Sequence, residues 1–173
     1  MAGSRYKIVD AGGANVVPTY RWQTEANVAV GALNVGMLLK FKTNGSPYAI
    51  ATVGTHAIGT ATAIIGVAAG AGTQTASADG FIDVFMPLSG VIYEGFASTA
   101  ANIDTLSELN ALLGDRVPQE VSATTDAGNW TIDENGTEGQ TNPFLLVGGD
   151  HTVQTLKFMI RHGATALGDQ DLA

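Results

Sequence analysis

The uncharged stretch from Thr43 to Ala78 is the feature of this sequence that most restricts its fold. Within it only His56 can carry a charge, and most other residues are Ala, Gly, Thr or short apolar runs. A membrane-spanning helix needs about 20 consecutive apolar residues, but the longest apolar piece here, Ala63 to Gly72, is shorter and contains glycines. The β-branched run AIIGV is typical of a strand. We therefore expect strands and turns, buried in a sheet core or against another molecule.

Two hairpins are predicted around this stretch. In MLLKFKTNGSPYAIATV, Asn44 and Gly45 can both adopt the positive φ that a type I′ turn requires, so the flanking segments should pair. A turn at Ser89 and Gly90 would pair FIDVFMP with VIYEGFA as a second hairpin.

Alternation with a period of two predicts which side chains face the core. In FIDVFMP, Ile82, Val84 and Met86 share one face and Phe81 lies on the other. Further strands are expected in EVSATT, NWTIDEN, FLLVGG and TVQTLKFMIRHG. In the last of these, the predicted core residues are Leu156, Phe158 and Ile160.

One helix is predicted in DTLSELNALLGDRVP. Thr105 and Glu108 have the spacing of a capping box, and Gly114 is placed to end the helix in the left-handed conformation. Its buried side should be lined by Leu106, Leu109 and Leu113. The expected fold class is therefore mainly β, a compact β-barrel or β-sandwich with one short α-helix over its open end.

The first 19 residues show no sustained periodicity and are expected to form an extended N-terminal arm. Residues 20–173 would then form a single β-rich domain. The segment MAGSRYKIVD has no apolar core of the kind found in secretory signals, so we expect no secretion and no membrane insertion.

Charge is distributed unevenly along the chain. The first 42 residues carry five basic and two acidic residues, a balance of +3, whereas the remainder carries three basic and 14 acidic residues, a balance of −11. The net charge of −8 argues against nucleic-acid binding, which depends on Lys and Arg contacts to phosphate. The basic front is suited to an acidic partner. The absence of cysteine excludes disulfides and thiolate metal sites.

Three motifs partly match known catalytic or ligand-binding patterns, and none of them supports an active site. RHG at 161–163 is followed by no second arginine; DENGTEG at 133–139 has its glycine at the wrong position for an EF-hand calcium loop; and GAGTQT at 70–75 lacks the lysine of a phosphate-binding loop. His56, His151 and His162 are too scattered to form a metal site by spacing. We therefore expect no enzyme activity and no cofactor.

The order GMLLKFKTNGSPYAIAT, AIIGVAA and FIDVFMPLSGVIYEGFA, from Gly36 to Ala97, resembles the head-decoration, or cement, proteins of tailed bacteriophages. This resemblance implies a β-tulip-like body and a structural function. The protein would bind the outside of the assembled capsid as a homotrimer, contact the major capsid protein and stabilise the shell. It would be made in the cytoplasm of the host bacterium and reside on the virion exterior.

The resemblance also implies two sets of contact residues. The arm would bind the capsid, with Tyr6, Tyr20 and Trp22 as its aromatic anchors, because large aromatic side chains dominate interface energies. The full set of expected capsid contacts is Arg5, Tyr6, Lys7, Val16, Val17, Tyr20, Arg21 and Trp22. The expected subunit interface is formed by Ile65, Val67 and Ala69.

Two other classes of function stay open. One is a virion-associated carbohydrate-binding domain for host recognition, which would stack sugars on exposed aromatic rings. The other is a trimeric β-fold hydrolase of nucleotides, which would need a cluster of Asp or Glu with Arg and Ser near a phosphate.

Overall fold

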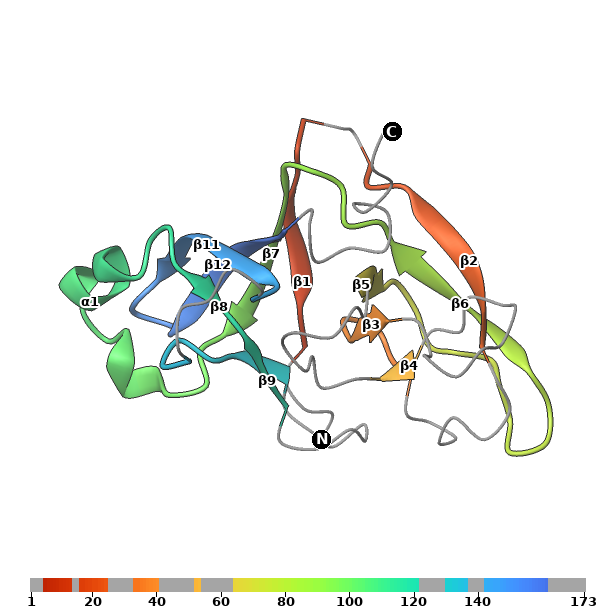
Figure 1. Ribbon diagram of the computed structural model, residues 1–173. Coiled ribbons are helices and arrows are strands. Elements are labelled where there is room, and N and C mark those ends of the chain that lie inside the picture. The colour runs from red at the N-terminus through yellow and green to blue at the C-terminus, as the bar shows by residue number, and fades with distance from the viewer. Residues whose placement is uncertain are drawn as a thin grey trace.

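The computed structural model of the protein describes residues 5–13, 16–24, 33–40, 52–53, 64–121, 130–136 and 142–161. Figure 1 shows two sheets that occupy opposite halves of the molecule, with the single α-helix beyond the first sheet. The mainly β fold class is confirmed. No closed barrel is found among the described strands, and the two sheets fit a β-sandwich.

The first sheet contains five antiparallel strands in the order β1-β7-β12-β11-β8. They are β1 (Lys7–Ala11), β7 (Val91–Phe96), β12 (Thr155–Ile160), β11 (Phe144–Asp150) and β8 (Arg116–Val117). The predicted core residues Leu156, Phe158 and Ile160 of β12 are buried, as alternation requires.

The second sheet is also antiparallel, in the order β2-β6-β5-β3-β4. Its strands are β2 (Thr19–Thr24), β6 (Gly80–Phe85), β5 (Ile64–Ala68), β3 (Leu38–Lys40) and β4 (Thr52–Val53). A third, two-stranded sheet pairs β9 (Gln119–Val121) with β10 (Trp130–Ile132). In β6, Ile82 and Val84 are buried while Phe81 is exposed, as predicted.

Strand β5, from the uncharged stretch, is buried along its whole length. At its centre Gly66 has a φ of +140°, and a Cβ there would lie 2.0 Å from the carbonyl oxygen of Phe85. Only glycine allows this close approach of β5 to β6. Within the described part of the uncharged stretch, β5 and Gln74 are thus buried in the fold of one chain, whereas residues 75–78 are exposed.

The short helix α1 (Leu106–Ala111) begins at the predicted capping box. The Thr105 hydroxyl accepts from the backbone N–H of Glu108, and the Glu108 carboxylate accepts from the backbone N–H of Thr105 at 3.0 Å. Gly114 has the expected positive φ. The predicted leucine stripe is wrong, however: Leu109 is buried, but Leu106 and Leu113 are 58% and 44% exposed. Leu109 is therefore the one buried side chain of this short helix. A 3₁₀ turn, η1 (Ala100–Asn102), precedes the helix.

The second predicted hairpin is also wrong. The turn at Ser89 and Gly90 is present, but β6 belongs to the second sheet and β7 to the first, so the chain crosses between sheets there. In the first predicted hairpin, β3 and β4 pair antiparallel with Leu39 opposite Val53. Its turn at Asn44 and Gly45 lies outside the described residues.

The predicted N-terminal arm is part of the fold where it is described. Strand β1 pairs with β7, with Lys7 opposite Glu94. Just before it, Tyr6 is buried, and its backbone N–H donates to the carbonyl of Gly36 at 3.0 Å. The Tyr6 ring packs edge-on against the rings of Phe144 and Phe158. This segment therefore contributes to the core, which an arm free of the body would not do.

Candidate functional site

The described part of the acidic motif, residues 133–136, has a structural role. The Glu134 carboxylate is buried and accepts hydrogen bonds from the backbone N–H groups of Ser98 and Thr99 at 2.9 and 3.0 Å, and from the Asn102 side chain at 2.9 Å. These donors occupy both oxygens, so Glu134 fastens the turn before η1 to the end of β10. Among the described residues no group of three His, Asp or Glu side chains could hold a metal ion.

The glycine-rich motif at 70–75 is likewise part of the scaffold. Gln74 is buried, and its side-chain oxygen accepts a hydrogen bond from the Thr24 hydroxyl at 3.1 Å. The backbone N–H of Thr73 donates to the carbonyl of Phe81 at 2.9 Å. The motif thus contacts β2 through Thr24 and β6 through Phe81.

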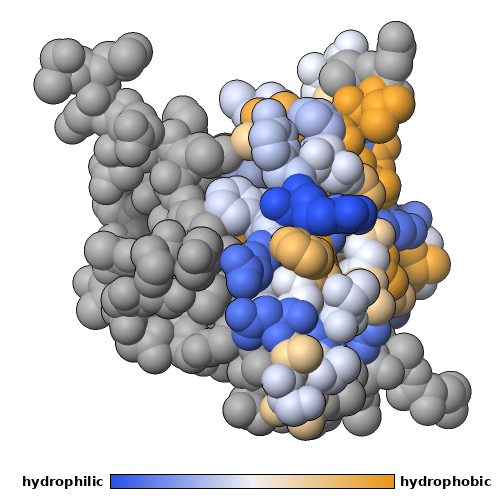
Figure 2. Space-filling view, turned by 90° about the vertical axis from the view of Figure 1, so that its right-hand side faces the viewer, coloured by the Kyte–Doolittle hydropathy of each residue, from blue (hydrophilic) through white to orange (hydrophobic). Residues whose placement is uncertain are grey.

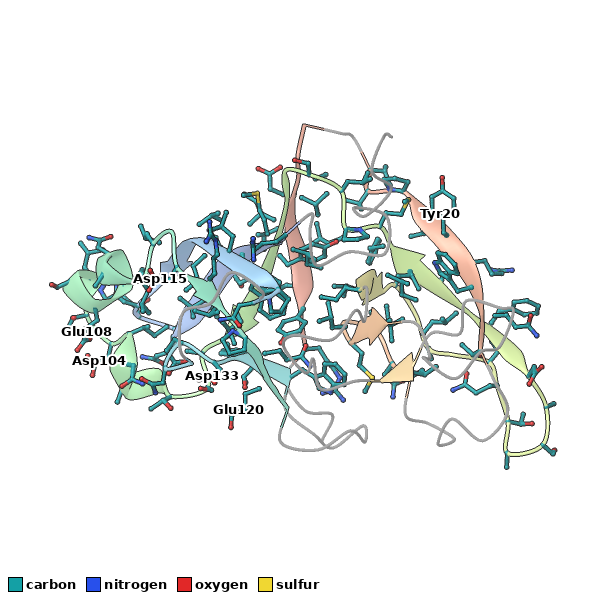
Figure 3. All side chains as sticks on the ribbon, in the orientation of Figure 1. Tyr20, Asp104, Glu108, Asp115, Glu120 and Asp133 are labelled. Atoms are coloured by element: carbon teal, nitrogen blue, oxygen red, sulfur yellow. The ribbon has the colours of Figure 1, made fainter. Side chains whose placement is uncertain are left out.

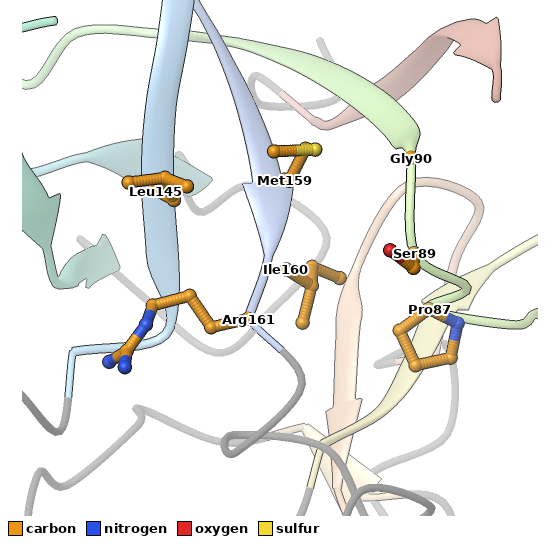
Figure 4. A pocket seen from close by; sticks show the side chains of 7 residues that line it. All are labelled: Pro87, Ser89, Gly90, Leu145, Met159, Ile160 and Arg161. Atoms are coloured by element: carbon orange, nitrogen blue, oxygen red, sulfur yellow. The ribbon is translucent and has the colours of Figure 1, made fainter. Parts of the chain in front are cut away.

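A pocket of about 210 Å³ lies where the first sheet meets the turn between β6 and β7 (Figure 4). Its lining is mainly apolar. The residues that line it are Pro87, Ser89, Gly90, Leu145, Met159, Ile160 and Arg161. Arg161, from the predicted RHG motif, donates to the carbonyl oxygen of Asn142 at 3.0 Å. His162 and Gly163 lie outside the described residues. Of the residues that line the pocket, Ser89 and Arg161 are the ones with polar side chains.

One group of described residues that could meet a macromolecular partner lies along β2, an edge strand of the second sheet. All six of its residues pair in register with β6, from Thr19 opposite Phe85 to Thr24 opposite Gly80. No other described strand pairs with its second side. We call this strand, together with Val16 and the side chain of Tyr20, the β2 edge. Val16 is 75% and Tyr20 54% exposed.

Charge on the β2 edge is locally balanced. The Arg21 guanidinium contacts the Asp83 carboxylate of β6 through two hydrogen bonds of 2.9 and 3.0 Å. The hydrogen bond from Arg21 lowers the pKa of Asp83. Figure 2, which faces this side of the molecule, shows hydrophobic side chains next to strongly hydrophilic ones.

A group of acidic residues lies at the other end of the molecule from Tyr20 (Figure 3). They are Asp104, Glu108, Asp115, Glu120 and Asp133. A hydrogen bond to Glu108 and the charge of that carboxylate raise the pKa of Asp104. Burial and the charges of Glu120 and Glu134 raise the pKa of Asp133. Asp104 and Asp133 thus each lie near another carboxylate, and Tyr20 of the β2 edge lies at the other end of the molecule from this group.

Comparison with protein-family models, with curated proteins and with solved structures finds no match to this chain. In the described part of the chain, no helix is long and apolar enough to cross a membrane.

The eight predicted capsid contacts divide into two groups. Val16, Tyr20 and Arg21 are exposed, and Lys7 is exposed but paired with Glu94 at 2.6 Å. The other four are wholly or partly enclosed by the protein's own fold, and they are Arg5, Tyr6, Val17 and Trp22. Tyr6 and Val17 cannot anchor a partner, because they already belong to the core.

The predicted subunit interface stays a prediction, but its residues are already enclosed within a single chain. Ile65 and Val67 are only 2% and 1% exposed within a single chain, and Ala69 is half-buried. Sequence reasoning did not name Phe81 as a contact residue, although Phe81 is 53% exposed on the outer face of β6. The alternation along β6 places Phe81 on the face away from Ile82 and Val84, which was enough to predict its exposure.

Proposed function

We propose that this protein is a structural virion component that binds the outside of an assembled bacteriophage capsid as a homotrimer and stabilises the shell by bridging major capsid protein subunits. The observation that carries this proposal is the β2 edge, a six-residue edge strand with exposed Tyr20, preceded by exposed Val16. The resemblance of residues 36–97 to capsid cement proteins indicates that the partner is the major capsid protein.

An exposed edge strand supports a binding function for a physical reason. Its outer N–H and C=O groups can pair with an extended segment of another chain, which is how many proteins recognise extended polypeptides. Tyr20 adds a large ring with few rotatable bonds, and tyrosine is enriched among the residues that dominate interface energies. The β2 edge thus offers both the directional bonds and the apolar contact that a specific interface needs.

Pre-formation of this surface favours binding. Strand β2 is already paired with β6 along its length. Binding then costs less conformational entropy than ordering a free arm would. A protein that binds only the assembled shell shifts the equilibrium toward that form by mass action, so many copies of modest affinity are sufficient.

The proposal is tested by co-sedimentation with empty capsids of the tailed phage that encodes the chain. Wild-type protein should sediment with the capsids at a fixed ratio. Tyr20→Ala should weaken binding about tenfold, equivalent to roughly 1.4 kcal/mol. Phe96→Ala is the matched control, since Phe96 is an exposed aromatic residue of the first sheet, and it should bind as wild type does. Absence of wild-type binding would refute the proposal.

A carbohydrate-binding domain is the second candidate, because the same exposed Tyr20 ring could stack on a sugar. Binding to a glycan array that is lost in Tyr20→Ala, without any capsid binding, would favour it.

A further inference from the structure

Two arginines lie beside the pocket on the outer face of the first sheet. Arg116 of β8 is directly opposite Leu145 of β11, and Leu145 is opposite Met159 of β12. Partners in an antiparallel register project to the same face. Since Phe144 and Phe158 fill the core, Arg116, Leu145 and Met159 form a row on the outside.

Asn142 fixes the position of both arginines. Its side-chain amide donates to the backbone carbonyl of Arg116 at 2.6 Å, and its own backbone carbonyl accepts from the Arg161 guanidinium at 3.0 Å. Figure 4 shows that this guanidinium lies on the Leu145 side of the pocket and away from Ser89 and Pro87. Burial and the nearby charge of Arg116 lower the pKa of Arg161, so the two cations are close enough to repel each other.

Arg116 is not neutralised within the described part of the chain. Neither of the ion pairs described above, Lys7 with Glu94 and Arg21 with Asp83, includes Arg116. A half-buried arginine next to a second guanidinium is favoured by an approaching carboxylate, which guanidinium groups bind through two parallel hydrogen bonds.

The size of the pocket indicates what accompanies that carboxylate. Pockets that enclose a small-molecule ligand usually measure about 300–1,000 Å³, whereas this one measures about 210 Å³ and is half-open. It has room for one apolar side chain, held between Leu145, Met159 and Pro87. An occupant of this kind is best supplied by a polypeptide, whose backbone remains outside the pocket.

We propose that this site binds an acidic segment of a partner protein, with an apolar side chain in the pocket and an adjacent Asp or Glu carboxylate on Arg116 and Arg161. The neighbouring guanidinium groups of Arg116 and Arg161 supply the complementary positive charge at this point of the surface. The inference rests on the proposed function, because it assigns a second contact surface and an acidic chemistry to the shell protein. It places that contact on the first sheet, whose strands do not pair with β2.

The site is tested on the purified chain, without capsids, by NMR of methionine methyl groups. The probe is the peptide acetyl-Gly-Asp-Leu-Asp-Gly-amide, titrated to millimolar concentration, and the Met159 signal is assigned with Met159→Leu. The Met159 methyl resonance should shift and saturate. Peptides with Asn in place of Asp, or Ala in place of Leu, should bind about tenfold more weakly.

Two arginine variants complete the experiment. Arg116→Gln should weaken the Asp peptide about tenfold. Arg21→Gln, the matched control in the second sheet, should bind it as wild type does. No shift of Met159 with the Asp peptide, equal binding of the Asn peptide, or unchanged binding by Arg116→Gln would each overturn the inference.

The outcome of the peptide titration can be distinguished from the outcome of the capsid-binding test. Peptide binding by a chain that ignores capsids would preserve the site and refute the capsid role. Capsid binding by a chain that ignores the peptide would do the reverse.

Discussion

The Tyr6 hydroxyl donates a hydrogen bond of 2.9 Å to the backbone carbonyl of Thr131, so the start of β1 is joined to β10 far along the chain. The Tyr6 ring is buried, and burial raises the pKa of its hydroxyl. A segment that the sequence predicts as an arm therefore joins three parts of the fold: β1, β10 and the aromatic core around Phe158.

Tyr6→Phe should lower the free energy of unfolding by about 1–3 kcal/mol, because it keeps the ring but leaves the Thr131 carbonyl without this donor. Tyr6→Ala should cost about 3–5 kcal/mol, since it also empties the ring's place in the core. Urea denaturation followed by far-UV circular dichroism measures both values. Equal stability of wild type and Tyr6→Ala would contradict the position of this segment in the fold.

The buried strand β5 gives a second prediction. Ile65→Asp should unfold the protein, because it places an unpaired charge in the core of one chain. Val16→Asp, at an exposed position, should change stability by no more than about 0.5 kcal/mol. Thermal unfolding compares the two variants. A folded but monomeric Ile65→Asp would restore the predicted subunit interface at this strand.

Glu134 tests whether a carboxylate is required at the turn before η1. Glu134→Gln replaces one acceptor oxygen with an NH₂ group that would face the N–H groups of Ser98 or Thr99. The expected loss is about 1.5–3 kcal/mol, the contribution of a hydrogen bond to a charged group. Glu120→Gln, at an exposed position, is the control and should change little. Denaturation midpoints of the two variants give the comparison.

The capping box predicts a pH dependence for α1. Hydrogen bonds from Thr105 lower the pKa of Glu108 below its ordinary value of 4.5. A carboxylate whose pKa is lower in the folded state stabilises the fold above its unfolded pKa, and this stabilisation disappears as the pH falls through the folded pKa. Asp104 partly opposes the effect, because Glu108 raises the pKa of its carboxyl group.

Amide hydrogen exchange across Leu106–Ala111 measures this dependence. Protection of α1 in wild type should decrease as the pH falls below 4.5, relative to the rate expected for an unstructured peptide. Glu108→Ala should show weak protection throughout. Identical pH profiles for the two proteins would exclude a role for the cap.

Short-range patterns of this sequence predict its local structure well. The capping box at Thr105 needs only residues within one helical turn, and the buried faces of β6 and β12 follow from alternation alone. Strand pairing depends on residues far apart, so β7 pairs with β1 and β12 although β6 precedes it directly. No local pattern distinguishes a buried Tyr6 from an interfacial one.

The candidate sites were predictable to different degrees. Tyr20 was identified as an interface residue from its type and is exposed, whereas Val17, almost adjacent to it, is buried. Arg116 and Arg161 could not be paired from the sequence, because their proximity depends on the register of β8, β11 and β12 and on Asn142 between them.

Sedimentation velocity of the purified chain, alone and mixed with empty capsids, tests the central proposal most directly. The proposal predicts a trimer that co-sediments with capsids at a fixed ratio, and a Tyr20→Ala variant whose binding is about tenfold weaker. A chain that remains monomeric and does not sediment with capsids would contradict it.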